Sequence, residues 1–327
     1  MRWLAGLALL LLVGAGIALW LAPEEPTSLE ASFDPARLEG GVDEYLAAQE
    51  ARVPGIVEGT QKRVIWAGAS RETTDWAVVY VHGFSASSEE TRPMPDLVAE
   101  ALGANLFFTR LAGHGRDGAA MDDATLTDWM ADMAEAMAVG RAIGERVLVI
   151  GTSTGATLAT LAAADPALAE GLAGIAMISP NFQVKNPASV ILTWPGARSW
   201  APVLAGEERA FLPANEAQAR YWTTRYPTTA LLPMAETVKA ARGLDHGALD
   251  VPAFFILSDL DQVVDQSISR EVEANWGGPT QMWVVPEGVT EAMNHVLAGD
   301  ILSPEMTGPV AERIADWARS LPGLSPD

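Results

Sequence analysis

The sequence predicts an α/β fold with a doubly wound, mostly parallel sheet. Near-continuous runs of Val, Ile and Phe indicate strands buried on both faces, and these runs alternate with stretches of helical character. Such alternation is typical of a parallel sheet covered by helices on both sides. With 327 residues, 49% of them hydrophobic, the chain is long enough for one large domain with a sizeable core.

The first 22 residues are predicted to be a membrane segment outside this fold. Residues 3–22 carry no charge, and about 20 apolar residues are needed to span a bilayer as a helix. A cleaved signal peptide has a shorter apolar stretch and a small-x-small site, but Trp20 stands two positions before Ala22. We therefore expect an uncleaved signal-anchor, with secretion after cleavage as the alternative. Arg2 favours a cytoplasmic N-terminus, which places the rest of the chain on the extracytoplasmic (periplasmic) side.

Residues 23–62 are expected to be a connector with one helical patch, and the α/β core is expected at 63–182 and 250–327. Residues 183–249 have several prolines and no clear strand, so they are predicted to form a helical cap inserted between two core strands. The cap aromatics either line a pocket or pack a small core of the cap itself; they are Trp194, Trp200, Tyr221, Trp222 and Tyr226. The expected strands are residues 63–68, 77–84, 104–113, 146–153, 174–181, 252–259 and 281–288, and the clearest helices are 43–51, 127–143, 155–164, 267–276 and 309–321.

Charge and composition exclude several classes of function. The formal net charge is −21, from 42 acidic and 21 basic residues, and such a surface repels nucleic acid and anionic lipid. The chain has no cysteine, which excludes disulfides, thiolate metal sites and cysteine nucleophiles. The four histidines have no spacing typical of metal ligands, so neither a metal nor a cofactor is expected.

The stretch "VLVIGTSTGATLA", residues 147–159, places Ser153 where a buried strand ends and a helix begins. A tight turn there projects the hydroxyl beyond the sheet edge, and Gly151 and Gly155 remove side chains that would clash. The start of the next helix offers free amides to a developing oxyanion. The alternative is a plain glycine-rich loop, but the flanking strand and helix favour a nucleophile elbow.

A serine nucleophile needs a base and an orienting acid, which follow it in this type of fold in the order serine, acid, histidine. Of the two histidines after Ser153, His246 precedes a core strand, whereas His295 follows the last strand and can return to the same sheet edge. The loop "SDLDQVVD" offers three acids. We favour Asp261 over Asp259 by its position before Val263–Val264, and we expect Asp265 to cap the next helix.

The oxyanion donors are expected to be two backbone amides. In enzymes of this type one comes from the residue after the nucleophile, here Thr154, and one from the loop after an earlier strand, here Phe84. His82 and His114 both precede Ser153, so we expect each of them to brace a loop rather than to act on substrate.

Taken together, these motifs resemble the α/β-hydrolase superfamily, most of all the branch of bacterial monoacylglycerol lipases, carboxylesterases and serine-aminopeptidase-like proteins. The motifs are His82-Gly83-Phe84, Gly113-His114-Gly115, Gly151 to Gly155, the Asp261 loop and Asn294-His295. Thr154 and Ser258 depart from the residues that are commoner in that branch.

The resemblance implies a serine hydrolase that cleaves carboxylic esters through Ser153, Asp261 and His295 and an acyl-enzyme. Its substrate would be a small or lipid-like ester, and it would need no cofactor. A serine peptidase or amidase remains open, with Glu207 and Glu208 as groups that could hold a substrate amine. A non-catalytic scaffold is the third possibility, and the sequence leaves the oligomeric state undetermined.

Overall fold

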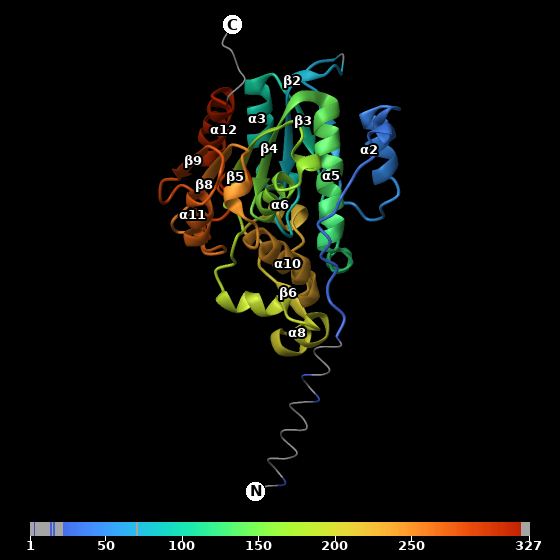
Figure 1. The fold of residues 1–327 in the computed structure, drawn as a ribbon, viewed down its shortest axis with the longest axis vertical. Coiled ribbons are helices and arrows are strands. Elements are labelled where there is room, and N and C mark those ends of the chain that lie inside the picture. Colours follow the sequence, from blue (N-terminus) through green and yellow to red (C-terminus); the bar gives the residue numbers. More distant parts are fainter. Residues whose placement is uncertain (1–2, 4–13, 15, 17–21, 70, 322–327) are drawn as a thin grey trace.

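A seven-stranded sheet forms the centre of the computed structural model, which describes residues 22–69 and 71–321 together with positions 3, 14 and 16 (Figure 1). The strand order is β1-β3-β2-β4-β5-β8-β9, and every neighbouring pair is parallel except β1 and β3. The predicted α/β fold and its seven core strands are confirmed. The strands are β1 (Arg63–Ile65), β2 (Thr74–Val81), β3 (Asn105–Phe108), β4 (Gly144–Thr152), β5 (Leu172–Ile178), β8 (Ala253–Leu257) and β9 (Thr280–Val284).

Helices cover both faces of this sheet, as the buried residues of β2 show. Val79 and Val81 pack in one apolar cluster with helices α5, α6 and α11, whereas Val78 and Tyr80 face a second cluster with α3 and α12. Alternate residues of one strand therefore supply two separate cores. The helices are α3 (Met94–Leu102), α5 (Leu126–Ile143), α6 (Thr154–Ala163), α11 (Gln266–Ala274) and α12 (Pro304–Arg319); the short helices α4 (Gly118–Asp122) and α7 (Pro166–Ala169) lie in connections.

Helix α12 begins earlier than the sequence pattern predicts. It starts at Pro304 rather than Pro309, so Pro309 lies inside the helix. A proline there removes one backbone hydrogen bond. The apolar face of the helix offsets this loss, because Met306, Val310 and Ile314 are all buried against the sheet.

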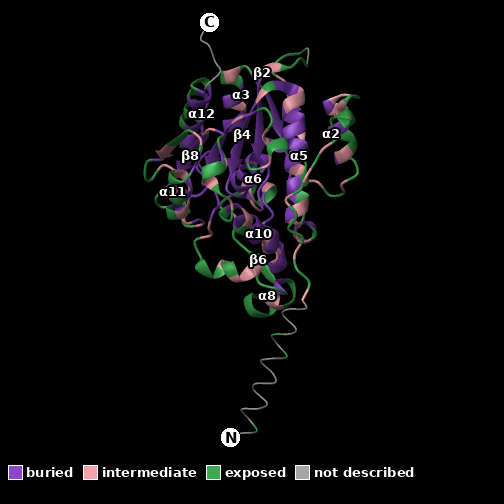
Figure 2. Ribbon diagram, viewed as in Figure 1, coloured by how far each residue is buried: buried purple, intermediate pink, exposed green. Residues whose placement is uncertain are grey.

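The segment between β5 and β8 is not purely helical, which corrects the expectation of a cap without strands. Strands β6 (Glu208–Ala210) and β7 (Arg225–Pro227) form a small antiparallel sheet of their own. All three residues of β6 are exposed, so this strand contains no buried apolar run that would reveal it in the sequence (Figure 2). The other elements of this segment are η3 (Pro187–Thr193), α8 (Ala197–Ala205), α9 (Glu216–Tyr221), η4 (Thr228–Ala230), α10 (Leu231–Arg242) and η5 (His246–Ala248).

The N-terminal part contains η1 (Pro35–Leu38) and α2 (Val42–Glu50), which confirms the predicted helical patch. Helix α2 lies beside α5 at one side of the molecule (Figure 1). The expected signal-anchor, residues 1–22, lies almost entirely outside the described residues. Within the described part of the chain, no helix combines the length and the apolar character that crossing a bilayer requires.

Candidate active site

Ser153 lies at the sharp turn between β4 and α6. Its backbone has φ 51° and ψ −115°, a conformation that costs free energy for a residue with a side chain. Backbone hydrogen bonds hold it there: its N–H donates to Ile178 O at 2.8 Å, and its carbonyl accepts from the amides of Ala156 (3.1 Å), Thr157 (3.2 Å) and Asn181 (3.3 Å). The strand-turn-helix context predicted for this serine is therefore present.

Close packing explains both flanking glycines. A Cβ atom on Gly151 would lie 2.6 Å from Ala156 Cα, and one on Gly155 would lie 2.1 Å from Val81 O. Both distances are far below van der Waals contact, so the steric reason predicted for the glycines is confirmed. Because Gly155 lets α6 approach the end of β2, the turn at Ser153 lies directly beside the loop that follows β2.

His295 and Asp261 form a pair at the same edge of the sheet. His295 Nδ1 lies 2.9 Å from Asp261 Oδ2, and the side chains of both residues are buried. Asp261 Oδ1 accepts from the amides of Val263 (2.8 Å) and Val264 (2.9 Å), and Gln266 Nε2 donates to Oδ2 at 2.9 Å. An ionised carboxylate only accepts, so His295 Nδ1 carries the proton and Nε2 keeps a lone pair.

The electrostatics of the pair follow from this geometry. Burial by itself raises the pKa of Asp261, but the His295 charge and the donated hydrogen bonds outweigh it and lower that pKa. Burial by itself lowers the pKa of His295, but the charges of Asp261, Glu90 and Glu291 outweigh it and raise that pKa. The pair thus consists of a stable carboxylate and a histidine of increased basicity.

The structure places the other candidate acids and bases elsewhere. Asp259 pairs with Arg270 at the surface. Asp265 caps α11 by accepting from Ser267 N at 3.1 Å, as predicted. The His246 ring packs against Trp276, with 6.4 Å between ring centroids.

The loop after β2 supplies the candidate oxyanion donors. Within the described residues, the amides of Phe84 and Thr154 donate to no other protein group. A Cβ atom on Gly83 would lie 3.4 Å from Ser153 Cβ, so this loop borders the serine side chain directly. Two free amides beside one hydroxyl can stabilise negative charge that develops there.

His82 fixes the conformation of the loop after β2. Its Nε2 accepts from the Leu111 amide at 3.1 Å, so Nδ1 carries the proton and donates to Gly83 O at 2.9 Å. Burial, with the nearby charges of His114 and Arg110, lowers the pKa of His82 well below its usual value. His82 is therefore a neutral brace, as the sequence suggests.

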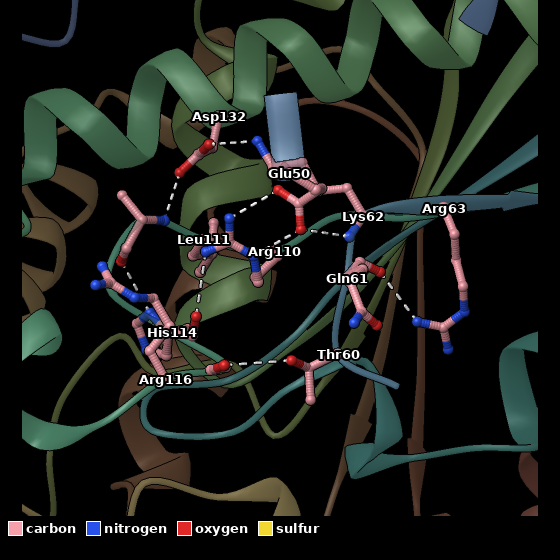
Figure 3. A network of polar contacts seen from close by, with 12 residues as sticks. Glu50, Thr60, Gln61, Lys62, Arg63, Arg110, Leu111, His114, Arg116 and Asp132 are labelled. Carbon is pink, nitrogen blue, oxygen red and sulfur yellow. Dashed lines mark hydrogen bonds and ion pairs between the residues drawn. The ribbon is translucent and has the colours of Figure 1, made fainter. Parts of the chain in front are cut away.

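A network of buried charges holds the loop that contains Leu111 (Figure 3). Arg110 donates to His114 O at 3.2 Å and forms a two-point pair with Glu50 of α2, at 2.9 and 2.7 Å. Asp132 of α5 accepts from the Ala112 amide at 2.6 Å and pairs with Lys62 at 2.9 Å. Elements α2 and α5 thus support the brace at His82.

Two glutamates contribute to the site although no sequence motif marks them. Glu291 Oε1 accepts from the His295 amide at 2.7 Å, which fixes the loop of the histidine. Glu90 is buried, accepts a hydrogen bond from the Gly83 amide, and forms no salt bridge with a Lys or Arg within the described residues. Both stand in polar stretches of the sequence, where a glutamate is usually a solvated surface residue.

The inserted cap contacts the loop after β2. Thr223 N donates to Ser85 O at 2.7 Å, and the rings of Tyr226 and Phe84 meet edge to face at 5.3 Å. A cavity of about 300 Å³ lies between η3 and α10. Ser153 and His295 are not among its lining residues, which are Gln183, Val184, Ser189, Val190, Thr193, Met234, Ala235, Val238, Lys239, Arg242 and Gly243.

Comparison with known proteins identifies the family. The sequence profile described as "Alpha/beta hydrolase family" matches residues 78–299, a range that contains Ser153, Asp261 and His295. The chain belongs to the alpha/beta hydrolase family. The resemblance inferred from the motifs is thereby confirmed. No curated protein sequence matches this hydrolase-family chain.

Three solved structures share the fold at low sequence identity. A chain from work on the metagenome-derived lipolytic enzymes LipS and LipT has a TM-score of 0.65 and 20% identity, covering 81% of this chain and 99% of that one. A soluble variant of the Saccharomyces cerevisiae monoglyceride lipase has 0.61 and 12%, covering 79% and 90%. The Paleococcus ferrophilus monoacylglycerol lipase has 0.57 and 15%, covering 79% and 98%.

The arrangement places Ser153 and the His295–Asp261 pair at one edge of the sheet, without a hydrogen bond between Ser153 and His295 among the described residues. It contains a strained serine, two free amides and a histidine whose basicity a buried carboxylate increases. Within the described residues, no group of three His, Asp or Glu side chains lies close enough to hold a metal ion.

Proposed function

We propose that the protein is a serine hydrolase that cleaves carboxylic esters through Ser153, His295 and Asp261. Ser153 attacks the ester carbonyl carbon while His295 Nε2 takes its proton. The amides of Phe84 and Thr154 hold the oxyanion, an effect worth about 3–4 kcal/mol for one donor in comparable enzymes. His295 then protonates the leaving alcohol, and water hydrolyses the acyl-enzyme with the same histidine as base.

The observation that carries this proposal is the His295–Asp261 pair at 2.9 Å on the same sheet edge as the strained Ser153. The carboxylate fixes the imidazole with its proton on Nδ1, the form that leaves Nε2 as a base. Lipolytic enzymes among the structures of similar fold favour an ester as the substrate.

A fluorophosphonate probe tests the proposal directly. We expect it to label the wild-type protein and to spare Ser153→Ala, with p-nitrophenyl ester hydrolysis lost in the same variant. Circular dichroism of Ser153→Ala controls for folding. Equal labelling of both proteins, or of neither, would contradict the serine mechanism.

Peptidase or amidase activity is a second candidate with less support. The glutamates proposed to hold a substrate amine lie at the surface of the cap, and Glu208 already pairs with Arg225 at 2.7 Å. Comparison of p-nitrophenyl esters with aminoacyl-nitroanilides separates the two activities. We expect kcat/KM for the esters to be the larger.

We also propose that residues 1–22 anchor the protein in a membrane, with the hydrolase on the extracytoplasmic side. Their length and apolar character support this location. Fractionation and the mass of the mature N-terminus test it. A mature chain that lacks these residues would contradict the anchor and indicate secretion after cleavage.

A further inference from the structure

The mechanism proposed above makes no use of Glu90, although this carboxylate lies in the site. Glu90 is the last residue of η2 (Ser88–Glu90), and only 3% of it is exposed. Its Oε2 accepts from the Gly83 amide at 2.8 Å and from the Tyr80 hydroxyl at 3.0 Å. Burial of a carboxylate is costly, and within the described residues no Lys or Arg pairs with it. The burial of this carboxylate without a basic partner therefore needs an explanation.

Glu90 lies next to the loop that carries the oxyanion donors and next to the loop that carries His295. A Cβ atom on Gly83 would lie 2.8 Å from Glu90 Oε1 and 3.4 Å from Ser153 Cβ, so the two side chains flank the same point. A Cβ atom on Gly299 would lie 2.6 Å from Glu90 O, and Asp300 N donates to Arg92 O at 2.9 Å. The loop that carries His295 thus packs directly on the segment of Glu90.

The contacts of Gly83 determine the direction of the next amide. Glu90 accepts from Gly83 N–H, and His82 Nδ1–H donates to Gly83 O, so both polar groups of this residue are held. The carbonyl of Gly83 and the N–H of Phe84 belong to one planar trans peptide and point in opposite directions. Fixing Gly83 on both sides therefore fixes where Phe84 N–H points.

The loop of His295 packs on the Glu90 segment at Gly299, and the charge of each of the two residues shifts the pKa of the other. Burial raises the pKa of Glu90 to about 7, although the Gly83 hydrogen bond, the Tyr80 hydrogen bond and the His295 charge all lower it. Tyr80, whose own pKa is raised well above its usual value, remains neutral. The charged groups that face His295 are Asp261, Glu90 and Glu291.

We propose that Glu90 is a positioning residue of this active site: it orients the Phe84 amide through Gly83 and adds a negative charge beside His295. This inference rests on the proposed serine mechanism. The free oxygen Oε1 faces the point between Gly83 and Ser153, whereas Oε2 holds the loop. Glu90 thus contacts the loop of the oxyanion donors through its carboxylate and the loop of His295 through its backbone.

Two substitutions separate the two roles. Glu90→Gln keeps an oxygen that accepts from Gly83 and Tyr80 but removes the charge, and Glu90→Ala removes both. Glu89→Gln is the matched control, because the neighbouring Glu89 pairs with Arg63 (2.8 Å) and Arg92 (3.2 Å) rather than with the site.

In Glu90→Gln we expect kcat at high pH to stay within a few-fold of the wild-type value. The acid limb of kcat/KM should move toward acid by up to about half a pH unit, because the protonated form of His295 loses a neighbouring negative charge that is partly present around the Glu90 pKa of about 7. In Glu90→Ala we expect kcat to fall about tenfold or more with little change in KM, because an oxyanion donor is misplaced. Glu89→Gln should match the wild type in both respects.

An NMR titration of His295 keeps this test independent of turnover. It is carried out in the Ser153→Ala background with and without Glu90→Gln, and we expect a lower His295 pKa with the substitution. Absence of ester hydrolysis by the wild-type protein would contradict the proposed function. An unchanged His295 pKa in the Glu90→Gln variant would overturn the charge role of Glu90. Wild-type kcat in Glu90→Ala would overturn its role in orienting the loop.

Discussion

Gly155→Ala tests whether the close approach of α6 to β2 sets the geometry of the site. The added Cβ would lie 2.1 Å from Val81 O and 2.7 Å from His82 O, both of them backbone atoms of one strand end. Ordinary contact begins at 3.4 Å, so the start of α6 must move by roughly 1 Å away from β2. This displacement carries Thr154 N–H away from the Phe84 amide.

The expected cost has two parts. Overpacking of a closely packed site costs about 1–3 kcal/mol of stability. A displacement of about 1 Å in a catalytic arrangement reduces kcat by about 100-fold. We therefore expect a lower Tm together with a much lower kcat for p-nitrophenyl esters, while the protein remains folded by circular dichroism.

Gly308→Ala is the control for this substitution. Gly308 lies in α12, and a Cβ there would meet no atom within 4 Å. Alanine is favoured over glycine in a helix by about 1 kcal/mol, so this variant should be slightly more stable and fully active. If Gly155→Ala also kept the wild-type kcat and Tm, the packing argument for the elbow would be refuted.

Three further predictions follow from the site and its support. Asp261→Asn cannot accept all four of the donors that now reach the carboxylate, so we expect His295 to lose its orientation and kcat to fall about 1,000-fold or more, measured by stopped assays. The wild-type kcat/KM should fall with decreasing pH, with a midpoint above the usual histidine value of about 6.5, because the pKa of His295 is raised and its neutral form is the base; a midpoint below 6 would contradict this. Arg110→Met leaves Glu50 buried without its partner and should lower the free energy of unfolding by about 3 kcal/mol, whereas Arg319→Met at an exposed pair should change it by less than about 1 kcal/mol in urea titrations.

The sequence determined the fold because the five inner strands of the sheet, β3, β2, β4, β5 and β8, are largely buried. Such strands are continuous apolar runs that can be recognised locally, whereas the edge strands β1 and β9 are partly exposed. The elbow at Ser153 is also a local feature, since glycines and a serine between a strand and a helix define it. The cap strands β6 and β7 were not predicted, because they are short and contain no buried residue, so neither forms an apolar run in the sequence.

The tertiary structure alone decided how the site is supported. Glu90 and Glu291 lie in polar stretches of the sequence, and no neighbouring residue distinguishes them from surface glutamates. The role of Glu90 arises from its contact with Gly83, which the fold of the loop brings beside it. Glu50 likewise pairs with Arg110, a residue far from it in the sequence. A sequence pattern records which residues can form a strand or a turn, whereas burial and charge pairing depend on which segments meet in space. Local patterning therefore determined the strands and the nucleophile turn, and long-range packing decided the electrostatics around them.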